Sequence, residues 1–139
     1  MKKYSVKLKH RSYDINIKPG IIKELPLFLS EYNENQKWII ISQHKIMELF
    51  GYKLEKQLKE NNFDCFNITL PNGETAKSIN EYHRVIEQMI DIGCDRKSII
   101  IALGGGVVGD VSGFIASTFM RGIKYFQVPT TLLSLSLIH

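Results

Sequence analysis

The sequence of 139 residues has few of the side chains on which metal sites and disulfide frameworks depend. Its two cysteines, Cys65 and Cys94, have no CxxC spacing, and none of the four histidines lies within ligand spacing of another. We therefore expect two buried, reduced thiols of the kind found in cytoplasmic proteins. We expect no metal site in this chain.

Long apolar runs and blocks of basic residues are also missing. No run of about 18 consecutive apolar residues occurs, and the first ten residues, MKKYSVKLKH, lack the apolar core of a signal peptide. The net charge of +4 comes from lysines and arginines that are scattered among acidic residues. These absences argue against a membrane span and a nucleic-acid-binding patch, so we expect no membrane partner and no nucleic-acid partner.

Charge is sparse in the last part of the chain. From residue 99 to residue 139 the only charged side chains are Asp110, Arg121 and Lys124. We expect most of this segment to be buried, either within the domain or against another surface.

Apolar periodicity predicts an alternation of strands and helices. Two stretches of period two, Tyr4–Lys9 and Tyr13–Lys18, predict an N-terminal antiparallel β-hairpin. Short apolar runs predict buried strands, and helical spacing predicts helices between them. The strands are expected at 38–41, 65–70, 98–103 and 125–128, and the helices at 21–29, 45–59, 79–92 and 107–120. This order predicts an α/β fold, an open doubly wound parallel sheet of Rossmann-like type behind the hairpin.

Finer features of these helices can also be predicted. In the helix over 45–59, one buried stripe is expected to carry Ile46, Leu49, Phe50, Leu54 and Leu58. Gly93 is expected to end the helix over 79–92 as a C-terminal cap, and Thr130 or Thr131 to begin a last helix.

A glycine-rich turn joins the third buried strand to the following helix. Gly104, Gly106 and Gly109 fit the pattern G-x-G-x-x-G, which lets a backbone approach a pyrophosphate at a helix N-terminus. The alternative is a tight turn used for packing. No acidic residue follows Asp110, so the carboxylate that a Rossmann site uses about 20 residues later is missing. Asp110 itself can accept hydrogen bonds from hydroxyls or an amide, or can simply be a helix N-terminal charge.

Three other segments follow predicted strands and are expected at the same edge of the sheet. In Pro71–Lys77, Glu74 can accept from ribose hydroxyls and Lys77 can reach a phosphate, unless the two form only a surface ion pair. In Val128–Leu133, the adjacent hydroxyls can bind a phosphate or cap a helix. Ser42–Lys45 is expected to be the remaining loop. Together these segments favour a nucleotide site.

Two motifs in this order resemble one family. The run GGGVVGDVSGFIASTFMRGIKYFQVPTTLL, together with the upstream PNGETAK, resembles the N-terminal domain of the 3-dehydroquinate synthase family. The resemblance covers residues 1 to 133, which we expect to form one NAD-binding domain. The glycerol dehydrogenase group shares the fold and a GGG…D turn, but MRGI followed by PTTLL favours the synthase family.

The resemblance implies a cofactor and a reaction. The family uses NAD and a divalent metal, zinc or cobalt, to convert 3-deoxy-D-arabino-heptulosonate 7-phosphate, a phosphorylated seven-carbon sugar acid, to 3-dehydroquinate and phosphate. The reaction belongs to the shikimate pathway, and NAD is regenerated in each turnover. By position, the residues that fall where the family binds NAD are Asn72, Gly73, Glu74, Lys77, Gly105, Gly106, Val107, Gly109, Asp110, Thr130 and Thr131.

The resemblance also implies one substrate-binding residue, and two residues differ from those that the family usually has near the adenosine ribose. Arg121 falls where the family places an arginine on the substrate phosphate, reaching across a dimer. Gln43 stands where the family often has Asp or Asn to hold the adenosine ribose, and Lys45 replaces the polar residue two further on.

The end of the chain also departs from the family. Residues 134–139, SLSLIH, do not resemble the family's continuation into a helical domain that carries the metal ligands and most catalytic residues. We therefore expect a truncated or frameshifted chain that binds NAD, has no catalytic residue of its own, and associates, as a homodimer or otherwise, through an exposed apolar face over 107–137. The alternatives are a non-catalytic nucleotide-binding module and a truncated oxidoreductase similar to glycerol dehydrogenase.

Overall fold

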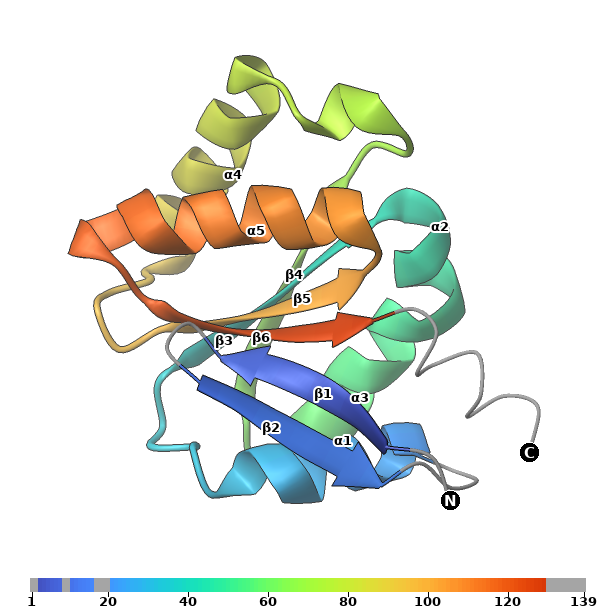
Figure 1. Ribbon diagram of the computed structural model, residues 1–139. Helices are drawn as coiled ribbons and strands as arrows, with labels where there is room; N and C mark the ends of the chain where they lie inside the picture. The colour runs from blue at the N-terminus through green and yellow to red at the C-terminus, as the bar shows by residue number, and fades with distance from the viewer. Residues whose placement is uncertain (1–2, 9–10, 17–20, 130–139) are drawn as a thin grey trace.

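The computed structural model describes residues 3–8, 11–16 and 21–129, with side chains from Glu24 to Pro129. Six strands form one sheet in the order β2-β1-β6-β5-β3-β4 (Figure 1). Four of them, β3 (Lys37–Gln43), β4 (Asp64–Leu70), β5 (Ile99–Gly104) and β6 (Lys124–Pro129), pair in parallel, as the sequence predicts. At the edge, β1 (Lys3–Leu8) pairs antiparallel with β2 (Arg11–Asn16) and with β6.

Helices cover both faces of this sheet. On one face lie α1 (Ile21–Ser30), α2 (His44–Ile46), the π turn η1 (Met47–Gly51) and α3 (Tyr52–Glu60), and on the other lie α4 (Ile79–Ile92) and α5 (Gly106–Thr118) (Figure 1). The doubly wound α/β class expected from the sequence is confirmed.

Alternating side chains of β3, which lies between β5 and β4, divide the core into two layers. Trp38 and Ile40 of β3 pack into the cluster that holds side chains of α1 and α3, whereas Ile39 and Ile41 pack into the cluster with α4 and α5. All four are fully buried, because a strand with helices on both faces has no polar side.

The helix expected over 45–59 differs in one respect. The π turn η1 lies inside it and adds a residue to one turn, which rotates the apolar stripe. Met47 and Phe50 are buried, but Leu49 is 54% exposed, so its predicted place on the buried stripe was wrong. Leu54 and Leu58 are buried as expected.

Helix α4 begins and ends at the predicted residues. Ser78 caps its first turn, because the Ser78 hydroxyl accepts a hydrogen bond from the Glu81 N–H at 3.2 Å. Gly93 ends it in the left-handed conformation (φ 94°), and its N–H donates to the carbonyls of Met89 and Ile90. The capping role expected of Gly93 is confirmed.

The charge-sparse segment is buried in part, so the expectation of a mostly buried segment is only partly met within the described residues. Every residue of β5 is buried, and α5 buries Val108, Val111, Ser112, Ile115 and Ala116. The glycine turn and the outer side of α5 are exposed, including the large apolar side chains of Phe114 and Met120. The expected helix start at Thr130 and Thr131 lies outside the described residues.

Candidate functional site

The amino end of α5 lies at the carboxyl edge of the sheet. Strand β5 ends at Gly104, whose φ of 147° is a conformation that side chains disfavour. Gly105 then occupies the N-cap position, and none of the described side chains caps the helix there. The first N–H groups of α5 are therefore left without a capping partner from a side chain.

Space surrounds this turn. Gly105 and Gly106 are exposed, and among the described residues a Cβ atom at either position would meet no atom within 4 Å apart from its own stretch of backbone. The glycines thus leave an open cradle in front of unpaired N–H groups and a positive helix end, an arrangement that fits a pyrophosphate.

Gly109 has a different role. A Cβ there would overlap Gln127 Nε2 of β6 and would lie 3.0 Å from Gln127 Cδ. Its N–H is already bonded to the Gly105 carbonyl at 3.0 Å. The third glycine of the motif therefore permits close packing of α5 on β6, while Val107 beside it packs half-buried against the core.

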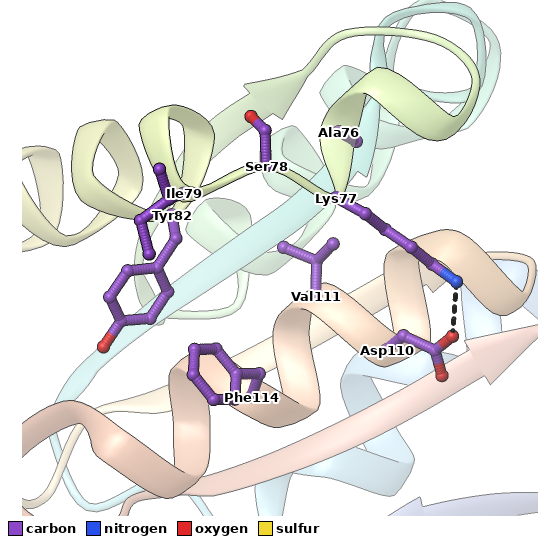
Figure 2. Close-up of a pocket in the computed structure, with 8 residues that line it drawn as sticks. All are labelled: Ala76, Lys77, Ser78, Ile79, Tyr82, Asp110, Val111 and Phe114. Atoms are coloured by element: carbon purple, nitrogen blue, oxygen red, sulfur yellow. Dashed lines mark ion pairs between the residues drawn. The ribbon is translucent and has the colours of Figure 1, made fainter.

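Charged side chains from two segments meet beside the glycine turn. The Lys77 ammonium lies 2.9 Å from Asp110 Oδ2 (Figure 2). It also lies 3.7 Å from Glu74 Oε2. The hydrogen bond to Asp110 and the attraction of Asp110 and Glu74 raise the pKa of Lys77 above its usual value. The Glu74–Lys77 ion pair considered in the sequence analysis is the longer of these two contacts. The shorter contact, from Lys77 to Asp110, joins the β4–α4 turn to α5.

The β4–α4 turn, which includes η2 (Glu74–Ala76), is joined by hydrogen bonds to the end of β3 and the start of α2. Gln43 Nε2 donates to the carbonyls of Pro71 at 3.0 Å and Gly73 at 2.9 Å. The Lys45 N–H donates to Asn72 Oδ1 at 3.2 Å. The expected loop over Ser42–Lys45 was wrong, because β3 runs through Gln43 and α2 starts directly at His44.

A pocket of about 290 Å³ opens next to the Lys77–Asp110 pair (Figure 2). Its walls are mostly apolar, and the rings of Tyr82 and Phe114 lie 4.9 Å apart in it. The Tyr82 hydroxyl shares a hydrogen bond of 2.7 Å with Thr118 Oγ1. Ile79, which is 78% exposed, also lines it. The sequence analysis did not predict this pocket. Its signal in the sequence was the presence of large apolar residues, Ile79 and Phe114, at helix positions that face outward.

The predicted site residues fall into three groups. The structure brings Asn72, Gly73, Glu74, Lys77, Gly105, Gly106, Val107, Gly109 and Asp110 to one edge of the sheet. Thr130 and Thr131 lie outside the described residues. Arg121 lies at the far end of α5, about 20 Å away for a helix of 13 residues.

Arg121 sits in an unusual turn. In η3 (Phe119–Arg121), Met120 and Arg121 have φ of 47° and 67°, and Gly122 follows with φ of 111°. The turn is closed by the Gly122 N–H, which donates to the Phe119 carbonyl at 2.7 Å, and by the Ile123 N–H, which donates to the Ala116 carbonyl at 2.7 Å. This geometry leaves the Arg121 side chain exposed and away from the glycine turn of its own chain.

In the part of the chain that the structure describes, no group of three or more His, Cys, Asp or Glu side chains could hold a metal ion. No helix there has both the length and the apolar character needed to cross a bilayer.

Comparison with known proteins decides the family. The model of the 3-dehydroquinate synthase N-terminal domain matches residues 67–136, half of the chain. The chain belongs to the 3-dehydroquinate synthase family. Curated 3-dehydroquinate synthases from Prochlorococcus marinus subsp. pastoris and Thermodesulfovibrio yellowstonii are 43% and 42% identical to it over 96% of its length. The chain spans only about 37% of the length of these relatives.

Solved structures share the fold of this family member. A 2-deoxy-scyllo-inosose synthase superposes with a TM-score of 0.77 at 21% identity, covering 93% of this chain and 36% of that one. A second structure, of a 2-deoxy-scyllo-inosose synthase complexed with carbaglucose-6-phosphate, NAD+ and Co2+, also has a TM-score of 0.77 at 21% identity. The glycerol dehydrogenase of Schizosaccharomyces pombe gives a TM-score of 0.63 at 16% identity, over 84% of this chain and 29% of that one.

Proposed function

We propose that this chain is the NAD-binding part of a 3-dehydroquinate synthase. The whole enzyme would convert 3-deoxy-D-arabino-heptulosonate 7-phosphate to 3-dehydroquinate and phosphate. The observation that carries the proposal is the uncapped, open amino end of α5 at Gly105 and Gly106, with Lys77 and Asp110 beside it. Family membership supports the same conclusion.

The residues at this edge suggest how NAD would be held. The first N–H groups of α5 would bind the pyrophosphate, and Lys77 would reach a phosphate oxygen. Glu74, whose side chain is 77% exposed, would accept hydrogen bonds from ribose hydroxyls. Asp110 would orient Lys77 and accept from a hydroxyl or an amide. When bound, NAD supplies a hydride acceptor.

The remaining parts of the proposal concern groups beyond this edge. Thr130 and Thr131 would complete the NAD site. A divalent metal, zinc or cobalt, would be bound by residues of the enzyme outside the described chain. Arg121, exposed at the far end of α5, would contact the substrate phosphate of a partner subunit in a homodimer. The enzyme would act in the cytoplasm, which cell fractionation can test.

Isothermal titration of the chain with NAD tests the proposal. We expect saturable binding at micromolar to millimolar NAD. Gly106→Leu should raise Kd about tenfold or more, because its side chain would fill the cradle. Ser117→Leu, a matched change at an exposed position later on the same helix, should leave Kd unchanged. A chain that is folded by circular dichroism but binds no NAD at millimolar concentration would contradict the proposal.

An activity assay separates the alternatives. The chain would be mixed with the separately expressed C-terminal part of a family member, and phosphate release from the seven-carbon substrate would be followed. Turnover supports the synthase. Binding of NAD without turnover favours a non-catalytic nucleotide-binding module, and oxidation of glycerol favours an oxidoreductase of the glycerol dehydrogenase group.

A further inference from the structure

A second pocket lies at the amino edge of the sheet, where β5 and β6 begin (Figure 1). Its volume is about 380 Å³, which is within the range of small-molecule sites. Ile99 at the start of β5 lines this amino-edge pocket, whereas Gly104 at the end of the same strand leads into the glycine turn. The 6 residues of β5 span about 17 Å, so the pocket is distinct from the proposed nucleotide site.

Three segments line the amino-edge pocket, and they differ in the charges that they carry. The segment between α1 and β3 contributes two carboxylates, those of Glu31 and Glu34. The turn before β5 and the start of β6 contribute three cations, those of Arg96, Lys97 and Lys124. The pocket therefore has negative side chains on one wall and positive side chains on the other two.

These five charged side chains are exposed, and none of them forms an ion pair with another described side chain. Exposed charges on a convex surface face only water, but these five line one concavity. Unpaired charges of both signs are complementary to a ligand that itself carries both signs. A ligand with a single charge would be attracted by one wall and repelled by another.

Hydrogen bonds within the segments fix the backbone of two walls. Gln36 Nε2 donates to the Tyr32 carbonyl at 2.8 Å, and Gln36 Oε1 accepts from the Glu34 N–H. In the turn before β5, Ser98 Oγ accepts from the Asp95 N–H at 2.9 Å, and the Ser98 N–H donates to the Asp95 carbonyl at 3.1 Å. A pocket with an ordered backbone loses less conformational entropy when a ligand binds.

We infer that the amino-edge pocket is a second binding site, which takes a small zwitterionic molecule. The carboxylate of the ligand lies toward Arg96, Lys97 and Lys124, and its ammonium lies toward Glu31 and Glu34. The inference does not depend on the proposed binding of NAD, because none of the residues assigned to NAD lines this pocket.

An NMR titration of the chain tests the inference. The probes are glycine, 4-aminobutyrate and 6-aminohexanoate, in which the distance between carboxylate and ammonium grows. We expect at least one of them to shift the amide signals of Ser98 and Gly122, which line the pocket, with saturation at millimolar concentration. The shifts should be the same when NAD is present. The carboxylic acid and the amine of the same chain length should each bind about threefold or more weakly, because each lacks one charged group.

Glu34→Gln and Lys97→Gln each remove one charge from a different wall and should raise the Kd of the probe about two- to fivefold. Both side chains are exposed, so neither change removes a core contact. Glu60→Gln and Lys53→Gln are the matched controls, because these exposed charges of α3 lie outside the pocket and should leave Kd unchanged.

Four results would overturn the inference. No probe saturates in protein that is folded by its NMR spectrum, or the analogues with one charge bind as tightly as the zwitterion. Alternatively, NAD displaces the probe, or both pocket variants bind it with unchanged Kd. Because the readout is the binding of these probes at Ser98 and Gly122, its failure is separate from any failure of NAD binding at the glycine turn.

Discussion

The ammonium of Lys77 lies 2.9 Å from the carboxylate of Asp110, which joins the turn after β4 to the first turn of α5. Both side chains are largely accessible, with 41% and 68% of their surface exposed. Water screens such a pair, so its contribution to the stability of the fold is small. Its consequence is local, because it fixes a cation beside the open end of the helix.

The ionisation of Lys77 should report this pairing. Asp110 raises the pKa of Lys77 above 10.5, so the stabilisation from the pair is present below 10.5 and is lost as pH rises through the higher folded-state value. In an NMR titration of the Lys77 side chain, the midpoint should lie above 10.5. Asp110→Asn should move it back toward 10.5. An unchanged midpoint in Asp110→Asn would show that the two groups do not interact in solution.

Gly109→Ala should stabilise the protein less than alanine normally stabilises a helix. The added Cβ would overlap Nε2 of the half-buried Gln127 side chain, so the amide at the end of that flexible side chain has to move aside. We expect the free energy of unfolding in urea to change by less than about 0.5 kcal/mol, whereas alanine in place of glycine at an unobstructed helix position gains about 1 kcal/mol. In the Gln127→Ala background the same substitution should give the full gain, because the overlap is absent. Equal effects of Gly109→Ala in both backgrounds would contradict close packing of α5 on β6.

Gly106→Ala should affect NAD binding rather than stability. In the part of the chain that the structure describes, the added Cβ meets no other segment within 4 Å, so the urea midpoint should stay the same or rise slightly. The affinity for NAD should fall, because the methyl group occupies the cradle. A stable variant with unchanged NAD affinity would place the pyrophosphate elsewhere.

Ser78→Ala should weaken the start of α4. The Ser78 hydroxyl accepts the Glu81 N–H at the first turn, and loss of an N-cap typically costs about 1 kcal/mol. Ser78→Asp should retain most of that stability, since aspartate also caps helices. Equal urea midpoints for the alanine variant and the natural protein would show that the cap is dispensable.

Cys65 should resist alkylation in the folded protein. Burial raises the pKa of its thiol to about 12, so almost no thiolate is present at neutral pH. Burial also raises the pKa of the Cys94 thiol. Mass spectrometry after iodoacetamide treatment should find Cys65 unmodified in native protein, and both cysteines modified in urea. Rapid modification of native Cys65 would show that β4 opens readily.

The order of strands and helices followed from local patterns. Continuous apolar runs such as Trp38–Ile41 identify strands that are buried on both faces, and the capping residues Ser78 and Gly93 lie at the ends of α4. The π turn at Met47–Gly51 could not be predicted, because it depends on how Met47 and Phe50 fit the core and not on apolar spacing.

The sequence by itself determined that a glycine turn follows a buried strand and opens a helix, and that Glu74, Lys77 and Asp110 follow strand ends. Only the tertiary structure decided which of these groups touch. In the structure, Lys77 lies closer to Asp110 than to Glu74. Gly109 packs against Gln127, and the Gln43 side chain donates hydrogen bonds to the backbone carbonyls of Pro71 and Gly73. The physical reason is that strand order and register set these distances between segments far apart in the chain, and local residue pattern does not encode them.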